Sequence, residues 1–326
     1  MRRRSPGRSL ALLTVLLSLA AAGCETGPPV KPTSLASGAA GGVYQPIAEA
    51  IAKIAKDTPG LDLPLTVEAT GASIANVQLL SDGKVQLALA QNDIVFYAAE
   101  GTTLPAFRDK ARKNLRAIMS LYPEFVQIVA AKSANVTSVD GFRGKRVALG
   151  PEGSGTEQNA LQVLDVHGLK ATDLARADRI DTADAVTKLR AGELDGAFFT
   201  VGAGSGLVGD LLGDGRFQLV PVTRAKVGQL LTKVPFYWLD EIPGGTYPGQ
   251  TAAVPTPSLR VLLLTTANAE EPAVYGLTKA LVDNIPTLQK AHPAAAGMST
   301  DTLLRVVTVP LHPGALRFYR ERNIQQ

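Results

Sequence analysis

The stretch LGPEGSGTEQNALQVL, residues 149–164, has the form of a strand end, a glycine-rich turn and the start of a helix. A nucleotide-binding P-loop needs a lysine directly after the second glycine of its G-x-x-x-x-G spacing. Gly150 and Gly155 have that spacing, but Thr156 stands where the lysine is required. We therefore expect no nucleotide at this turn, although the free N–H groups of a helix start still favour a small anion.

Two further glycine-containing turns precede predicted helices, SGAAGGVYQP at residues 37–46 and TGAS at residues 70–73. Glycines let the backbone approach a ligand closely, and Ser154, Thr156 and Tyr44 add hydroxyl groups and an aromatic wall. A purely structural alternative stays open, in which the glycines only form tight turns and Ser or Thr caps its own helix. Because open α/β sheets bind ligands at the carboxyl ends of their strands, the turns together favour a binding cleft.

The alternation of strand and helix patterns predicts an α/β fold with a mostly parallel sheet. Apolar and alternating runs predict strands at residues 63–69, 85–90, 125–130, 146–149 and 196–201. Helical spacing predicts helices from about Tyr44 and at residues 156–167, 182–191, 272–284 and near Thr302. The segment from Ser73 matches the segment from Thr182 in the spacing of its apolar residues and glycine, so we expect two similar lobes.

The chain begins with MRRRSPGRSLALLTVLLSLAAAGC, which is typical of a secretory signal over residues 1–23. Its end resembles a bacterial lipobox, with Cys24 as the acylated residue and Ala21 where leucine is preferred. The proline-containing residues 24–34 are expected to form a tether. Cys24 is the only cysteine, which excludes a disulfide, a thiolate metal site and a cysteine nucleophile elsewhere in the chain.

Charge and motif content narrow the function classes. The four arginines ahead of residue 24 account for the net charge of +4, so the rest of the chain is neutral and nucleic-acid binding is not expected. No G-x-S-x-G or H-E-x-x-H motif is present, and His167, His292 and His312 have no partner that the sequence identifies. We therefore expect a protein that is not an enzyme and needs no cofactor or metal.

Six segments in order resemble the TAXI family of extracytoplasmic solute receptors, which work with tripartite ATP-independent periplasmic (TRAP) transporters. They are residues 37–53, 68–93, 115–129 (LRAIMSLYPEFVQIV), 144–156, 189–202 and 242–250. The resemblance implies a two-lobed, type II-like periplasmic-binding-protein fold with the ligand cleft between the lobes. It also implies a membrane permease as partner, and glutamate, glutamine or 2-oxoglutarate as the kind of solute.

The resemblance places lobe I at residues 35–122 plus 257–326 and lobe II at residues 123–256, with hinges near 120–124 and 257–262. It implies these ligand-binding residues: Gly42, Val43, Tyr44, Thr70, Ser73, Asn76, Gln91, Asn92, Tyr122, Ser154, Gly155, Thr156 and Gly202. The segment 201–204 departs from the family pattern, which usually has a proline there. Alternatives to a transport receptor are an enzyme on the same scaffold and a binding lipoprotein that feeds a sensor.

Overall fold

The computed structural model describes Met1 and residues 33–38 and 42–325. The predicted signal sequence beyond Met1, Cys24 and the tether up to residue 32 lie outside the described residues. Within the described part of the chain, no helix is both long enough and apolar enough to cross a membrane.

One sheet runs through the body that begins at residue 32, in the order β2-β1-β3-β10-β4-β7-β5-β6, with β8 paired to β4 and β9 to β10. The strands are β1 (Thr33–Ala36), β2 (Leu65–Glu68), β3 (Leu87–Gln91), β4 (Leu115–Ala131), β5 (Arg146–Ala148), β6 (Arg176–Asp178), β7 (Gly196–Gly202), β8 (Phe217–Leu219), β9 (Trp238–Ile242) and β10 (Val254–Thr266). The β2-β1-β3 and β6-β5-β7 groups are each parallel, as the sequence predicts.

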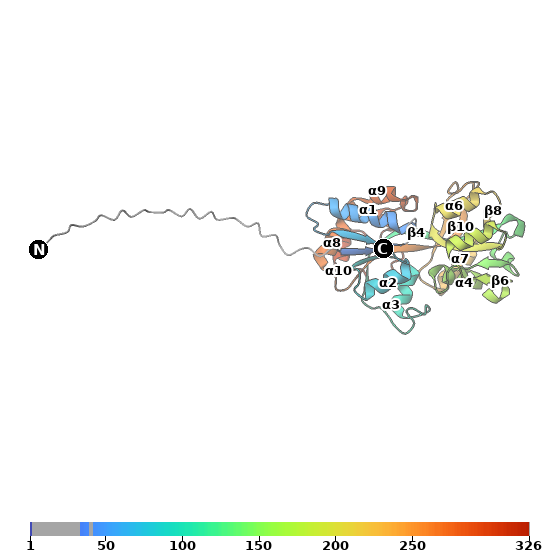
Figure 1. The fold of residues 1–326 in the computed structure, drawn as a ribbon, viewed down its shortest axis with the longest axis horizontal. Helices are drawn as coiled ribbons and strands as arrows, with labels where there is room; N and C mark the ends of the chain where they lie inside the picture. Colours follow the sequence, from blue (N-terminus) through green and yellow to red (C-terminus); the bar gives the residue numbers. More distant parts are fainter. Residues whose placement is uncertain (2–32, 39–41, 326) are drawn as a thin grey trace. The chain divides into compact units, whose positions relative to one another are not determined.

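Two long antiparallel strands, β4 and β10, join these groups (Figure 1). Near one end β10 pairs with β3, and near its other end it pairs with β9. The β4–β10 register is irregular between Arg260 and Leu262, opposite the β4 segment from Ser120 to Pro123. The predicted lobe boundaries fall inside these strands, at 122/123 in β4 and 256/257 in β10; they stay a prediction.

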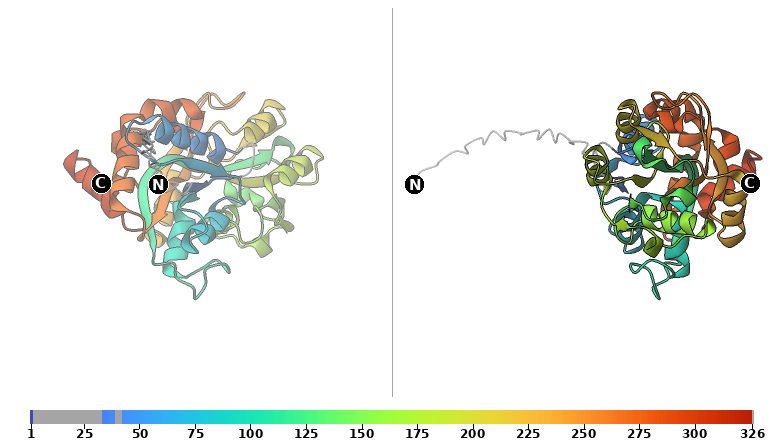
Figure 2. Two further views of the ribbon diagram at one scale, coloured as in Figure 1. Left: turned by 60° about the vertical axis from the view of Figure 1, so that its left-hand side comes forward. Right: turned by 90° about the vertical axis from the view of Figure 1, so that its right-hand side faces the viewer.

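Helices cover both faces of the sheet (Figures 1 and 2). They are α1 (Tyr44–Asp57), α2 (Ser73–Ser81), α3 (Asn92–Glu100), α4 (Gly155–Val166), α5 (Thr182–Arg190), α6 (Gly206–Gly213), α7 (Arg224–Lys233), α8 (Glu271–Asp283), α9 (Ile285–Ala291) and α10 (Pro313–Glu321). We use lobe I for β1–β3 with α1–α3 and α8–α10, and lobe II for β5–β9 with α4–α7. The crossing strands β4 and β10 belong to both.

Apolar side chains divide into three buried clusters. Helices α1, α8, α9 and α10 pack on one face of lobe I, and α5 and α6 pack on one face of lobe II. The third cluster is continuous across the lobes, because α2 and α3 of lobe I share it with α4 and α7 of lobe II. The edge-to-face pair of Tyr97 and Phe236, whose ring centroids are 5.4 Å apart, lies in this shared cluster.

The predicted α/β alternation is confirmed, with one wrong helix. Residues near Thr302 form only a short 3-10 turn, Thr300–Thr302. The β-branched run that follows disfavours a helix, and Val306 has a positive φ of 51°. The last helix, α10, was not predicted; it begins at Pro313, and the His312 Nδ1 accepts a hydrogen bond from the Gly314 N–H.

Candidate functional site

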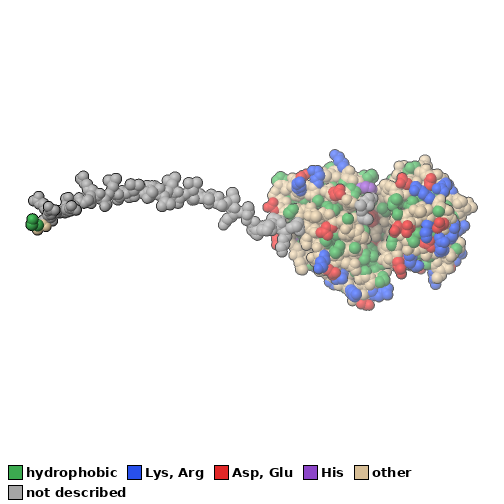
Figure 3. Space-filling view, viewed as in Figure 1, with side chains coloured by type: hydrophobic (Ala, Val, Ile, Leu, Met, Phe, Trp, Pro, Cys, Tyr) green, Lys and Arg blue, Asp and Glu red, His purple; other side chains and the backbone are tan. Residues whose placement is uncertain are grey.

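A cavity of about 320 Å³ lies between the lobes, and both lobes contribute to its wall. Figure 3 shows a furrow between the two halves of the folded body, with acidic and basic side chains interspersed on this face. Lobe I supplies Gly38, Gly42, Val43, Tyr44, Gly71, Ala72, Ser73, Ile74 and Gln91, β4 supplies Glu124, and lobe II supplies Pro151, Ser154, Gly155, Thr156, Thr182 and Thr200. Eight of the thirteen residues predicted to bind a ligand are therefore brought together here.

Hydrogen bonds connect the polar side chains on the lobe I wall. The hydroxyls of Tyr44 and Ser73, which are the first residues of α1 and α2, lie 3.0 Å apart. The Ser73 Oγ also accepts a hydrogen bond of 3.0 Å from the Gln91 N–H. The Gln91 Nε2 in turn donates to the Glu124 Oε2 over 2.6 Å. Four residues, from three elements of lobe I and from β4, are thus connected by hydrogen bonds.

Glu124 is the only ionisable side chain of the cavity lining besides Tyr44, among the residues that the structure describes. It is almost fully buried, and burial raises its pKa to about 8. The hydrogen bond from Gln91 opposes the shift in pKa, and the nearby Asp93 adds to it. Asp93 is also buried, which raises its own pKa to about 6. At neutral pH the cavity therefore carries a mostly uncharged carboxyl group.

The lobe II wall is the glycine-rich turn at residues 150–156, which leads into α4. Gly150 has a φ of 99°, and a side chain there would also collide with Thr156, so the position requires glycine. The Ser154 Oγ accepts from the Glu157 N–H over 3.1 Å and caps α4. The Glu157 carboxylate accepts from the Gly153 N–H over 2.6 Å and pairs with Arg179 over 2.5 Å. The structural alternative, in which the serine caps its own helix, is confirmed for Ser154.

The hydroxyls of Thr156 and Thr182 are different, because neither forms a hydrogen bond within the described chain. Both residues line the cavity, in the first turns of α4 and α5. They are therefore the hydroxyls of lobe II that are free to bind a solute. Thr200 also lines the cavity, but its hydroxyl donates to the Asn159 Oδ1 over 2.9 Å.

Two glycines allow the lobes to approach each other closely. A Cβ on Gly155 would lie 2.4 Å from the Gln91 Oε1 and 3.1 Å from the Ile94 Cδ1, both in lobe I. A Cβ on Gly202, at the end of β7, would lie 2.7 Å from the Ala294 Cβ of lobe I. The start of α4 and the end of β7 are thus the points where larger side chains would separate the lobes.

Five predicted residues lie outside the cavity lining. Asn76 and Thr70 hold the turns in place: the Asn76 Nδ2 donates to the Ser37 and Leu89 carbonyls, and the Thr70 hydroxyl donates to the Asn76 Oδ1. Their polar groups are used within the fold, which leaves them in a supporting position behind the first glycine turn.

Asn92, Tyr122 and Gly202 are the other three. The Asn92 Nδ2 donates to the Phe236 carbonyl over 2.9 Å, and its Oδ1 accepts from the Arg260 N–H, so it ties α3 to β10. Tyr122 is fully buried, and its hydroxyl has no partner among the described residues. Gly202 pairs with Glu124 across β7 and β4 and serves the contact with Ala294.

Sequence reasoning missed Glu124, Thr182 and Thr200. Glu124 had a signal, since it is the single charged residue inside the mostly apolar run LYPEFVQIV at residues 121–129. Glu124 directly precedes the strand predicted at residues 125–130, and a carboxyl group that enters the interior with a buried strand requires a special environment. Thr182 and Thr200 had none, because each resembles any threonine at the start of a helix or inside a strand.

The three histidines have structural hydrogen bonds. The His167 Nδ1 lies 2.8 Å from the Val163 carbonyl, and His292 and His312 each accept from a backbone N–H two residues ahead. Among the described residues, no group of three or more His, Cys, Asp or Glu is arranged to hold a metal ion.

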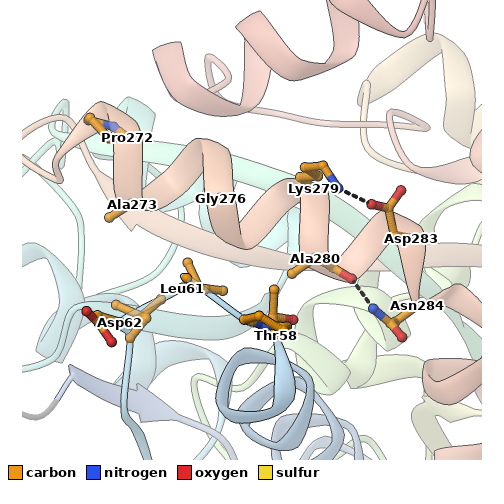
Figure 4. A pocket seen from close by; sticks show the side chains of 13 residues that line it. Thr58, Leu61, Asp62, Pro272, Ala273, Gly276, Lys279, Ala280, Asp283 and Asn284 are labelled. Atoms are coloured by element: carbon orange, nitrogen blue, oxygen red, sulfur yellow. Dashed lines mark hydrogen bonds and ion pairs between the residues drawn. The ribbon is translucent and has the colours of Figure 1, made fainter.

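A larger cavity, of about 430 Å³, lies within lobe I between the segment after α1 and helix α8 (Figure 4). Several of its polar side chains pair with each other or with the backbone: Lys279 with Asp283, and the Asn284 Nδ2 with the Ala280 carbonyl over 2.9 Å. The cavity between the lobes is the better candidate site, because it combines unpaired hydroxyls with a buried carboxyl group.

The model of the NMT1-like family matches residues 35–322. The chain belongs to the NMT1-like family. Among solved structures it is similar to a protein from Bordetella bronchiseptica RB50, with 16% identity over 90% of this chain and 98% of that one and a TM-score of 0.55.

Two further solved structures are also similar. PhnD1 from Prochlorococcus marinus (MIT 9301), solved with methylphosphonate, is 11% identical over 90% of this chain and all of that one, with a TM-score of 0.54. The periplasmic aliphatic sulphonate binding protein SsuA from Escherichia coli is 17% identical over 90% and 94%, with a TM-score of 0.50. Likeness at these identities shows the fold, so the predicted two-lobed periplasmic-binding-protein fold is confirmed.

Proposed function

We propose that this chain is an extracytoplasmic receptor that captures a small acidic solute between its lobes and delivers it to a membrane transporter. The observation that carries the proposal is the cavity of about 320 Å³, to which both lobes present the starts of helices and lobe II presents the unpaired hydroxyls of Thr156 and Thr182. Helix starts favour anions, and a cavity of this size holds a small organic acid. Family membership over residues 35–322 and the similarity to the periplasmic aliphatic sulphonate binding protein SsuA and to PhnD1, which was solved with methylphosphonate, support the same role.

The finer assignment is a TAXI-type receptor of a TRAP transporter, with glutamate, glutamine or 2-oxoglutarate as the class of solute. The six ordered segments that resemble the TAXI family support it. Two of the similar proteins also take small acids or anions by their titles, methylphosphonate and aliphatic sulphonates. The partner is then a permease whose transport depends on an ion gradient.

The proposed mechanism is closure of the lobes around the solute, with β4 and β10 as the flexible connection. A solute favours the closed form because only there does it contact Ser73 of lobe I and Thr156 of lobe II together. Support comes from Gly155, where the start of α4 approaches Gln91 too closely for any side chain. The receptor performs no chemistry on the solute in this mechanism.

A lipid anchor at Cys24 is part of the proposal, supported by the signal-like residues 1–23 and the lipobox-like end. One bilayer-anchored acyl cysteine would keep the receptor near its permease. Cys24→Ser is expected to move the protein from the membrane fraction to the soluble extracytoplasmic fraction. Retention of the variant in the membrane fraction would contradict the anchor.

A thermal-shift panel of amino acids, dicarboxylates and oxo acids tests the receptor function. A true solute at about a hundred times its Kd should stabilise the fold by ~2.7 kcal/mol, and the shift should saturate. Saturable stabilisation by an acid of this class supports the proposal. Stabilisation only by phosphonates or sulfonates would keep the receptor function and replace the solute class.

A further inference from the structure

Glu124 has one carboxyl oxygen paired and one free. Its Oε2 accepts the 2.6 Å hydrogen bond from Gln91, whereas its Oε1 has no partner among the described residues. The side chain is only 4% exposed, and the residue lines the cavity between the lobes. Among the described residues, the fully buried polar side-chain atoms without a partner do not include this oxygen, so it is accessible from the cavity and a bound molecule can reach it.

No basic side chain faces this group from the described lining. The titratable groups around it are Asp93 on α3, the Tyr44 hydroxyl on α1 and the Tyr122 hydroxyl on β4 itself. On β10, Leu259 is the cross-strand partner of Glu124, so the neighbouring Arg260 points to the opposite face of the sheet.

Arg260 also has its own partners. Its guanidinium donates to the Ser120 Oγ over 3.0 Å and to the Leu121 carbonyl over 2.7 Å. From β7, the residue paired with Glu124 is Gly202, which has no side chain. The charges near Glu124 are therefore negative or absent, and an ionised Glu124 would repel an anionic solute at short range.

The starts of α1, α2 and α4 at the same cavity favour an anion. The helix starts attract an anion, whereas an ionised Glu124 would repel it. Both groups can face the same anionic solute only if Glu124 keeps its proton. We propose that Glu124 is a specificity-determining residue for the solute. Its carboxyl group stays protonated and uncharged, and the hydrogen on its Oε1 is donated to a carboxylate oxygen of the solute. The inference rests on the proposed receptor function and adds a proton requirement to it; the proton stays on Glu124 and no bond is made or broken.

The pH dependence of binding follows from the proton. Burial and Asp93 raise the pKa of Glu124 to about 8, so the group is mostly protonated below that pH. A solute carboxylate raises the pKa further in the complex, and affinity should fall as pH rises through 8. With one linked proton, the Kd at pH 9 should be about tenfold higher than at pH 6.

Calorimetric titration of 2-oxoglutarate and succinate into the full protein from pH 6 to pH 9 tests the inference. Both acids are fully ionised in this range, since carboxyl groups titrate near pH 4, and neither carries an amine. At pH 8.5, titrations in buffers of different ionisation enthalpy should show uptake of roughly half a proton or more per solute bound.

Two variants make the test specific. Glu124→Gln places a permanent donor at the same position, so its affinity should change less than about threefold between pH 6 and pH 9. Glu241→Gln removes a half-exposed carboxylate of lobe II that pairs with Arg224, and it should keep the wild-type pH profile. Glu124→Gln also keeps the acceptor for Gln91, which favours normal folding.

The outcomes separate the inference from the receptor function. A Kd that rises with pH in wild type but not in Glu124→Gln supports it. A Kd that is independent of pH, or proton release with loss of affinity in Glu124→Gln, overturns it while the receptor function stands. If neither acid binds at any pH but another solute does, the inference is also wrong; if no solute binds at all, the proposed function fails with it.

Discussion

The two walls of the cavity look alike in sequence and differ in structure. Both consist of a glycine-rich turn that leads into a helix with hydroxyl residues. On lobe I the polar groups bond to one another, from Tyr44 through Ser73 and Gln91 to Glu124. On lobe II the bonds run inside the turn, from Glu157 to Gly153 and Ser154, and the Thr156 hydroxyl stays free.

This difference in hydrogen bonding indicates different roles for the two walls of the cavity. Lobe I presents a surface whose polar groups are held by hydrogen bonds within the fold, and burial there raises the pKa of Glu124. Lobe II uses Ser154 and Glu157 to shape its turn. In the proposed mechanism, closure brings the free hydroxyls of Thr156 and Thr182 to the solute. A solute that binds first to lobe I and is then covered by lobe II fits this division.

The largest expected effect concerns the buried acid at the lobe I side. Glu124 has a pKa of about 8 in the fold against 4.5 for an ordinary glutamate, so the folded protein binds a proton that the unfolded chain releases between these values. The free energy of unfolding therefore loses this contribution as pH rises from 4.5 to 8. Glu124→Gln should gain about 3 kcal/mol relative to wild type between pH 5 and pH 8.

Urea unfolding at pH 5 and pH 8, without solute, measures that difference. Glu241→Gln is the control, because its carboxylate is half exposed on the surface of lobe II. If the difference in unfolding free energy between wild type and Glu124→Gln does not change with pH, Glu124 is ionised in the folded protein.

The next effect tests whether lobe II depends on its internal bonds. Glu157→Ala removes the buried carboxylate that holds the Gly153 N–H and pairs with Arg179. We expect the free energy of unfolding to fall by about 2 kcal/mol. Glu152→Ala, at an exposed position of the same turn, should change it by less than about 0.5 kcal/mol. If the two variants change the free energy of urea unfolding equally, the structural role of Glu157 is contradicted.

A smaller effect is expected for the helix cap. Ser154→Ala removes the acceptor of the Glu157 N–H and should cost about 1 kcal/mol of unfolding free energy. Ser154→Asp, which keeps an acceptor, should restore most of it. If the alanine variant unfolds like wild type in thermal denaturation, the cap contributes little, and the serine is then free to serve a ligand.

The smallest effect on stability, and the sharpest on binding, belongs to Thr156. Thr156→Val replaces a hydroxyl that has no protein partner with a methyl group of similar size. Unfolding free energy should change by less than about 0.5 kcal/mol, and affinity for the solute should fall about tenfold. Thr187→Val, in the last turns of α5 and away from the cavity, serves as control for the affinity measurement. Unchanged affinity in Thr156→Val would exclude this hydroxyl from the site.

The sequence predicted the fold well because strand and helix spacing depends on local burial. The start of α1 at Tyr44 and the turn before α4 are correct for that reason. The helix predicted near Thr302 is wrong, since apolar spacing did not outweigh the β-branched run at residues 306–309.

The site was harder to predict, because side-chain roles depend on partners far along the chain. Asn76 and Asn92 have the chemistry of ligand-binding residues, but carbonyls from distant segments take their amide groups. Glu124 is brought to Gln91 only by the pairing of β10 between β3 and β4. No local pattern contains that neighbourhood.

The most direct test of the account is a crystal structure of the protein with the solute that stabilises it best. We expect electron density for the solute in the cavity between the lobes, with a carboxylate oxygen within hydrogen-bond distance of the Glu124 Oε1 and of the Thr156 hydroxyl. Density for the solute in the lobe I cavity beside α8, or bound to one lobe without contact to the other, would contradict it.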